Sequence, residues 1–251
     1  MVGSLPPPAS ESRVVYALDF PHIDAARLSA HAVRDSMGMF KVGLELFVGA
    51  GPAAVALGLE LGRPVFLDLK LHDIPETVER AVAGASALGA RMLTVHASGG
   101  PAMLRRAVER AQKEGRGLEV VAVTVLTSLD WGDLAAIGAA GDLASHVELL
   151  ARLAWSEGVR AFVCSPHEAA RLRAALGPEA TLITPGVRAV RAASEGGSDD
   201  QKRTMSAAEA IAHGADWIVV GRPIRDAADP PAVARTLARE VHTALAARHA
   251  K

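Results

Sequence analysis

The segment at residues 65–78, VFLDLKLHDIPETV, places three charged residues at the end of an apolar run. Asp68 and Lys70 have the period-two spacing that puts both side chains on one face of a β-strand, and Asp73 follows three residues later. Single buried charges are costly, so these must be paired, and Lys41 in an earlier run supplies a second cation. An ammonium group held between carboxylates can stabilise a developing negative charge and then protonate it.

Two structural interpretations compete with this chemistry. Asp73 opens the tetrapeptide DIPE, which matches a capping box with Asp73 as N-cap and Glu76 three residues on. A purely structural ion network would also explain Asp68 together with Lys70. Because Lys41 joins them at the end of a second strand, we favour a functional site.

The elements that position these residues alternate between short β-branched runs and longer segments with helical periodicity. Eight such strands and the helices between them predict a single-domain (β/α)8 barrel over 13–251, after a disordered lead-in at 1–12. A doubly wound open sheet is the competing architecture, but no strand is followed by the GxGxxG turn typical of it. The predicted strands are 13–19, 39–44, 64–70, 91–97, 118–126, 159–165, 180–186 and 216–222.

In such barrels the active site forms at the carboxyl ends of the strands. Several polar residues follow strand ends, and Gly221 and Arg222 after the eighth strand suit a phosphate site. The segment 188–204 is too long for an ordinary connection, so we expect it to be disordered or a functional lid. The further strand-end residues are Asp19, His96, Thr127, Ser128 and Arg188.

Composition excludes several classes of protein. The net charge of −1 provides no general field for nucleic acid. The single cysteine, Cys164, excludes an internal disulfide framework and is expected to be a buried thiol. His72 and His96 have no partner at metal-ligand spacing, so we interpret them as packing or supporting residues. No signal peptide and no apolar run near the roughly 20 residues of a membrane span are present, which predicts a cytoplasmic protein.

The whole motif set resembles the orotidine 5′-phosphate decarboxylase family. DLKLHDIPETV is similar to the family signature, an Asp-x-Lys-x-x-Asp array followed by Ile-Pro and a threonine. The resemblance runs from about Val14 to Arg225. Further blocks occur in the family's order: ALDF, FKVGLELF, TVLTS, TPGVR, DDQKR and VVGRPI.

The resemblance implies a role for each matching residue, and it implies decarboxylation of orotidine 5′-monophosphate to UMP without metal or organic cofactor. Lys70 would be the proton donor, and Asp73 with Thr77 would enter the partner subunit's site in a homodimer. The implied catalytic array is Lys41, Asp68, Lys70 and Asp73. The implied substrate contacts are Asp19 and Lys41 at the ribose, Thr127 and Ser128 at the pyrimidine, and Gln201, Gly221 and Arg222 around the phosphate, with Arg188 also in the binding set.

Three competing functions stay open at this point. The first is that of related barrels that act on phosphosugars, such as 3-keto-gulonate-6-phosphate decarboxylase or hexulose-6-phosphate synthase, which use magnesium held by a glutamate on the second strand. Here that strand carries Lys41, and Glu45 falls beyond it. The second is a Schiff-base aldolase using Lys70, and the third is a non-catalytic nucleotide-binding barrel.

Overall fold

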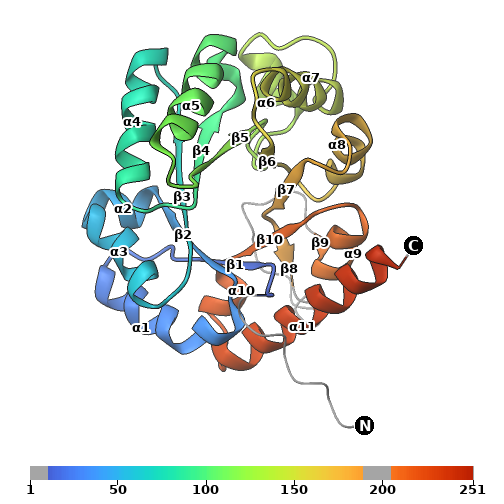
Figure 1. Ribbon diagram of the computed structural model, residues 1–251. Helices are drawn as coiled ribbons and strands as arrows, with labels where there is room; N and C mark the ends of the chain where they lie inside the picture. The colour runs from blue at the N-terminus through green and yellow to red at the C-terminus, as the bar shows by residue number, and fades with distance from the viewer. Residues whose placement is uncertain (1–10, 189–204, 251) are drawn as a thin grey trace.

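In the computed structural model the chain is described over residues 11–188 and 205–250. Eight parallel strands close a barrel with helices around it, which confirms the predicted single-domain (β/α)8 fold (Figure 1). The strand order around the barrel is β1-β10-β7-β6-β5-β4-β3-β2. These strands are β1 (Val14–Ala17), β2 (Met39–Gly43), β3 (Val65–Leu71), β4 (Met92–His96), β5 (Glu119–Val123), β6 (Ala161–Val163), β7 (Thr181–Thr184) and β10 (Trp217–Val220).

The helices begin with sequence signals that are typical of helix starts. Proline occupies the first turn of α3, α4, α5 and α11, and the side chains of Asp130, Asp142, Ser206 and Asp229 cap α6, α7, α9 and α11. The helices are α1 (Ile23–Val33), α2 (Leu44–Ala50), α3 (Pro52–Glu60), α4 (Pro75–Ala87), α5 (Pro101–Glu114), α6 (Trp131–Ala136), α7 (Leu143–Ser156), α8 (Ala169–Leu176), α9 (Ala207–Ala212), α10 (Arg222–Arg225) and α11 (Pro230–His249), with short 3-10 helices η1 (Arg34–Ser36) and η2 (Ala97–Gly99).

Alternation along the strands builds two apolar layers. The larger layer lies between strands and helices and contains Leu67 and Leu93. A smaller cluster fills the barrel interior with side chains such as Phe66, Met92 and Val121. Because one face of each strand packs inside the barrel and the other against helices, charged side chains can appear on the inner face only near an open mouth.

Two segments lie partly outside the described residues. A two-stranded parallel sheet, β8 (Val187–Arg188) with β9 (Met205–Ser206), joins the chain on either side of residues 189–204, which contain most of the expected lid. At the amino end residues 1–10 are likewise outside the described chain. Ser12, which we assigned to the lead-in, is buried and donates a hydrogen bond to the Ser36 carbonyl at 2.8 Å, so it belongs to the barrel.

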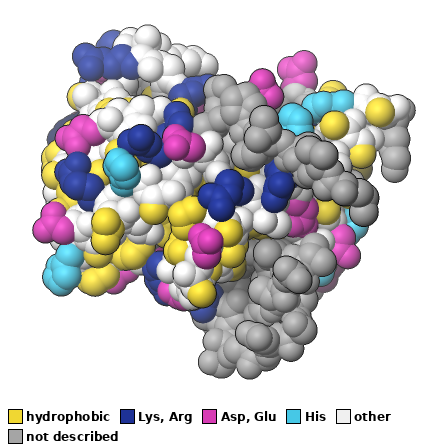
Figure 2. Space-filling view, turned by 90° about the horizontal axis from the view of Figure 1, so that it is seen from below, with side chains coloured by type: hydrophobic (Ala, Val, Ile, Leu, Met, Phe, Trp, Pro, Cys, Tyr) yellow, Lys and Arg dark blue, Asp and Glu magenta, His cyan; other side chains and the backbone are white. Residues whose placement is uncertain are grey.

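The surface carries charges of both signs. On the face shown in Figure 2, basic and acidic side chains are interspersed with apolar ones. Cys164, next to β6, is fully buried, as expected, and burial raises the pKa of its thiol. None of the described helices is long and apolar enough to cross a membrane.

Gly38, at the entry to β2, has no room for a side chain. A Cβ there would lie 2.0 Å from the Ser12 carbonyl oxygen and 3.0 Å from Trp217. Gly84, inside α4, provides the contrast, because a Cβ there would meet nothing within 4 Å. Backbone crowding therefore opposes alanine at the first position, while helix propensity favours it at the second.

We predict that Gly38→Ala lowers the free energy of unfolding by about 2 kcal/mol or more. Gly84→Ala, the matched control, should raise it by about 0.5–1 kcal/mol, since alanine is the better helix former. Urea unfolding followed by circular dichroism measures both. Equal effects of the two substitutions would contradict the packing at the entry to β2.

Candidate active site

Four charged side chains form a chain of ion pairs at the carboxyl ends of neighbouring strands. Lys41 Nζ lies 3.1 Å from Asp19 Oδ1 and 3.5 Å from Asp68 Oδ2. Lys70 Nζ lies 2.8 Å from Asp68 Oδ1. The Asp68 carboxylate is thus held between two ammonium groups, one on each oxygen, as the cost of burying a single charge requires.

Electrostatics keep the inner part of this array charged. Burial alone would lower the pKa of Lys41, but the charges of Asp68 and Asp19 outweigh it and raise that pKa. Burial likewise works to raise the pKa of Asp68, yet Lys41, Lys70 and the hydrogen bonds from Lys70 and Thr94 lower it. At neutral pH Lys41 is therefore an ammonium ion and Asp68 a carboxylate.

Lys70 is more accessible than its partners and has an unusual backbone. Its side chain is 31% exposed, against 13% for Lys41 and 12% for Asp68. Its φ of 50° is the only positive value at a non-glycine residue in the described chain. Such a conformation costs a lysine about 1–2 kcal/mol, and strain of this kind clusters at functional sites.

An irregularity in β3 produces that conformation. The register of β3 with β4 runs from Leu67 opposite Leu93 to Leu71 opposite Val95, so that three residues of β3 face one of β4. Simple period-two alternation, from which we placed Lys70 beside Asp68, is therefore not how the structure achieves this pairing. The two side chains do meet, but through a bulge.

Thr94 on β4 is a site residue that the sequence reasoning missed. It is fully buried, its hydroxyl donates to Asp68 Oδ1 at 3.0 Å, and it accepts the Lys70 backbone N–H at 2.7 Å. The sequence contained a signal for it. Thr94 stands two residues before His96, so both side chains are expected on the inward face of a strand that neighbours the strand of Asp68.

His72 and His96 lie beside the array and face each other, with ring centroids 5.5 Å apart. Burial, His72 and Lys70, in that order, lower the pKa of His96, so its ring is neutral at pH 7. Within the described residues no group of three or more His, Cys, Asp or Glu side chains is placed to hold a metal ion.

Asp73 does not cap α4, so the capping-box interpretation is wrong. The helix begins at Pro75 with Ile74 as N-cap, in the extended conformation that a residue before proline prefers. The Asp73 carboxylate accepts the adjacent Ile74 N–H at 2.6 Å, and no side chain caps the first turn. Glu76 pairs with Arg80 one turn along the helix. Asp73 and Thr77 are both exposed, and within the described chain no ion pair joins Asp73 to Lys70.

The residues expected around a phosphate occupy the next part of the same mouth. Gly221 is the N-cap of α10, and a Cβ there would lie 3.4 Å from Asp19 Oδ2, which places its backbone beside the ion-pair array. Arg222, the first residue of α10, is exposed. Arg225, which the sequence reasoning missed, donates to the Asp19 carbonyl at 3.1 Å and so fixes the loop after β1.

The remaining predicted contacts are spread over neighbouring loops. Thr127 and Ser128 form a turn four residues beyond the end of β5, later than the strand end we expected, and the Leu129 N–H closes it onto the Leu126 carbonyl at 2.9 Å. The backbone of Arg188 lies in β8, opposite Ser206. Gln201 lies outside the described residues.

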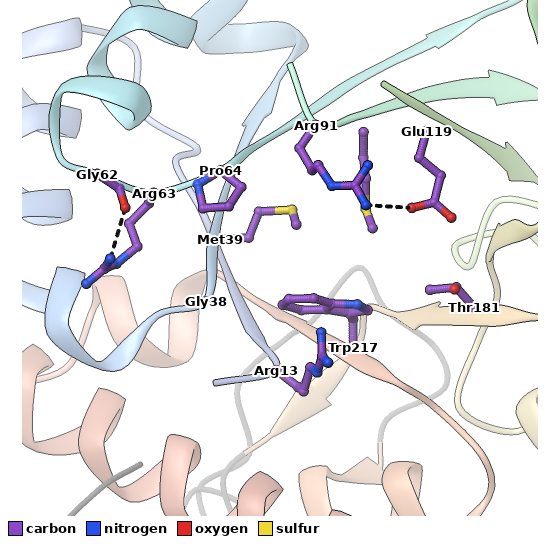
Figure 3. Close-up of a pocket in the computed structure, with 11 residues that line it drawn as sticks. Arg13, Gly38, Met39, Gly62, Arg63, Pro64, Arg91, Glu119, Thr181 and Trp217 are labelled. Carbon is purple, nitrogen blue, oxygen red and sulfur yellow. Dashed lines mark hydrogen bonds and ion pairs between the residues drawn. The ribbon is translucent and has the colours of Figure 1, made fainter. Parts of the chain in front are cut away.

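A cavity of about 470 Å³ opens at the opposite, amino-terminal mouth of the barrel (Figure 3). The Arg13 guanidinium covers the Trp217 ring at 4.7 Å, and Arg91 lies 3.9 Å from the Glu119 carboxylate. Its lining comes from the first residues of the strands and from the residues just before them, at the opposite end of the barrel from Lys70. This cavity is therefore not the candidate site.

Comparison with known proteins places the chain in one group. Residues 12–237 match the Orotidine 5′-phosphate decarboxylase / HUMPS family. The chain is 55% identical over 226 residues to the orotidine 5′-phosphate decarboxylase of Anaeromyxobacter sp. (strain K), which covers 90% of this chain and 96% of that protein. It is 48% identical over 229 residues to the enzyme of that name from Thermobifida fusca, covering 91% of this chain and 95% of the other.

The structural comparison agrees. The crystal structure of orotidine 5′-phosphate decarboxylase from Lactobacillus acidophilus superimposes with a TM-score of 0.77 and 31% identity, covering 92% of this chain and 99% of that one. On its barrel, its sequence and its motifs, the chain belongs to the Orotidine 5′-phosphate decarboxylase / HUMPS family.

Proposed function

We propose that the protein decarboxylates orotidine 5′-monophosphate to UMP and CO2, the last step of UMP synthesis. The observation that carries the proposal is the chain of ion pairs ending in Lys70, the most accessible ammonium group of the array. The relatives of this name, which align over most of both chains, support it.

The reaction needs a cation beside one carbon atom. When the bond from C6 of the pyrimidine to its carboxylate breaks, the electron pair stays on C6 in the plane of the ring, where the ring cannot delocalise it. The Lys70 ammonium stabilises this charge and then donates a proton to C6, forming UMP. Water returns a proton to the amine afterwards.

Asp68 and Lys41 prepare Lys70 for this role. Asp68 accepts a hydrogen bond from Lys70 Nζ at 2.8 Å and so fixes the ammonium group. Lys41 forms an ion pair with the second oxygen of Asp68. It also pairs with Asp19, and the two residues lie on the side of the array where we place the ribose. Fixed charges of this kind need no reorganisation when the negative charge develops, which is the main source of electrostatic catalysis.

In the proposal, the ribose, the pyrimidine and the phosphate of the substrate bind along the carboxyl-terminal mouth of the barrel. Asp19 and Lys41 hold the ribose, and Thr127 and Ser128 contact the pyrimidine. Gln201, Gly221 and Arg222 hold the phosphate, and Arg188 also belongs to the binding set. Binding energy at this remote group assists a chemical step that the phosphate itself does not touch. The segment that we expected to be a lid lies almost entirely outside the described residues.

The protein acts as a homodimer in this proposal. Asp73 and Thr77 are exposed, and Ile74 between them is 64% exposed. The apolar Leu44 and Val48 of α2, the helix that follows the neighbouring strand, are 53% and 81% exposed. This surface supports contact with a second copy, in which Asp73 and Thr77 complete the partner's site.

The proposed enzyme needs no cofactor and acts in the cytoplasm. A magnesium-dependent phosphosugar enzyme would require a glutamate on β2. Here Lys41 holds that place, and Glu45 is an exposed residue in the first turn of α2. A single buried thiol is in keeping with a reducing compartment.

We predict that the purified protein consumes orotidine 5′-monophosphate, seen as loss of its ultraviolet absorbance, at a rate unchanged by excess EDTA. Lys70→Ala should lower kcat/KM by at least about 10³-fold, because it removes both the proton donor and the stabilising charge. Lys113→Ala is the matched control and should keep full activity, because this exposed residue lies in the last turn of α5, which leads into the amino-terminal end of β5.

Each competing function would give a different result. Activity that requires magnesium would favour a phosphosugar enzyme, and trapping of a substrate on Lys70 by borohydride would favour an aldolase. Binding of UMP without any turnover would indicate a nucleotide-binding barrel.

The shared site predicts complementation between two inactive variants. Mixing Lys70→Ala with Asp73→Asn subunits gives heterodimers that contain one site with both changes and one intact site. If equal amounts of the two variants exchange subunits at random, about half of the dimers are heterodimers, and one of the two sites in each is intact. About a quarter of the wild-type activity should therefore return. Each variant alone, carried through the same exchange, is the control. No recovery in the mixture would show that each site takes Lys70 and Asp73 from the same chain.

A further inference from the structure

Thr94 lies where the regular pairing between β3 and β4 is interrupted. It is the residue of β4 opposite the bulge, between the paired positions Leu93 and Val95, and it is fully buried. Lys70 lies inside the bulge, among the residues of β3 that have no paired residue on β4. Its backbone N–H donates to the Thr94 hydroxyl at 2.7 Å, a side-chain acceptor in place of the usual backbone carbonyl of a ladder.

The direction of both hydrogen bonds at Thr94 is fixed by its partners. A backbone N–H only donates and an ionised carboxylate only accepts, so the hydroxyl must accept from Lys70 and donate to Asp68. One hydroxyl has the single proton and the lone pairs to do both. Valine has the shape of threonine but neither capacity.

Together these contacts close a ring around Lys70. Its backbone N–H binds Thr94 Oγ1, Thr94 binds Asp68 Oδ1, and the same Asp68 oxygen accepts Lys70 Nζ at 2.8 Å. The backbone between Asp68 and Lys70 includes the positive φ of 50° at Lys70. A strained conformation persists only where its surroundings hold it, and Thr94 is the buried neighbour that contacts both ends of this segment.

We propose that Thr94 is a positioning residue of this active site, whose hydroxyl holds Lys70 in its positive-φ conformation and thereby sets the place of its ammonium group. Thr94 acts through Lys70 and Asp68 and does not itself contact the reacting carbon. The catalytic consequence rests on the proposed decarboxylation, whereas the conformational claim stands without it.

Crystal structures of Thr94→Val and Thr94→Ser, together with their steady-state kinetics, test the proposal. In Thr94→Val we expect Lys70 to leave the positive-φ region and its Nζ to move out of hydrogen-bond distance of Asp68 Oδ1. The kcat for orotidine 5′-monophosphate should fall about 10- to 100-fold, because the stabilising charge is displaced. The Kd for UMP should change less than about threefold, since binding depends mainly on remote contacts.

Thr94→Ser keeps the hydroxyl and should retain the wild-type conformation and a kcat within about threefold. Thr94→Ala, which lacks the hydroxyl without adding a methyl group beside Asp68, serves as the second variant if Thr94→Val does not fold. A merely structural role would lower the stability of the serine and valine variants alike and would not separate kcat from UMP binding.

The outcomes distinguish this proposal from the proposed function. Wild-type activity together with an unchanged Lys70 conformation in the valine or alanine variant would overturn the role of Thr94 alone. A serine variant as impaired as the valine variant would do the same. A displaced Lys70 in these variants, with no turnover by the wild-type protein, would support the positioning role and contradict the decarboxylase assignment.

Discussion

The Asp68 carboxylate lies between the ammonium groups of Lys41 and Lys70, and the arrangement of the whole mouth depends on this contact. A buried carboxylate is stable only with such partners, and removal of one partner from a buried pair typically costs about 3–5 kcal/mol. In the proposed reaction the same contact keeps Lys70 in one place, beside the position where the charge of the substrate would develop. The ion pair between Asp68 and Lys70 therefore stabilises the fold and, in the proposed reaction, also holds the catalytic ammonium group in place.

The barrel supplies what this interaction needs. Parallel strands bring Asp19, Lys41, Asp68 and Thr94 from four neighbouring elements to one mouth, at positions set by the strand register. Apolar side chains such as Phe66 fill the interior beneath them, so the charges meet solvent on one side only. The opposite mouth has a cavity of its own but a lining unrelated to the array (Figure 3).

The fold and the centre of the site were predictable because both depend on local patterns. Alternating β-branched runs and helical periodicity predicted the eight strands, and Asp68 with Lys70 followed from period-two spacing in an apolar run. The bulge between Leu67 and Leu71 was not predictable, because it arises from the register of β3 with β4 and no residue pattern within β3 indicates it. Thr94 was missed although period-two spacing from His96 places it on the inward face of β4, because a threonine in an apolar strand does not by itself indicate a site. The capping box at Asp73 failed because a residue before proline is disfavoured in the helical conformation, so the helix begins at Pro75 and Ile74, not Asp73, is its N-cap. Pro75 carries this signal in the sequence, and we did not use it.

The most direct test of the central claim follows the proton at C6 in the absence of decarboxylation. If Lys70 delivers a proton to C6, it must also remove one, so the enzyme should exchange the C6 hydrogen of UMP for deuterium in D2O. Proton NMR of UMP should show the C6 signal fading with the wild-type protein and persisting with Lys70→Ala. Equal exchange by both proteins would contradict the account, because the carbanion would then be protonated by another group.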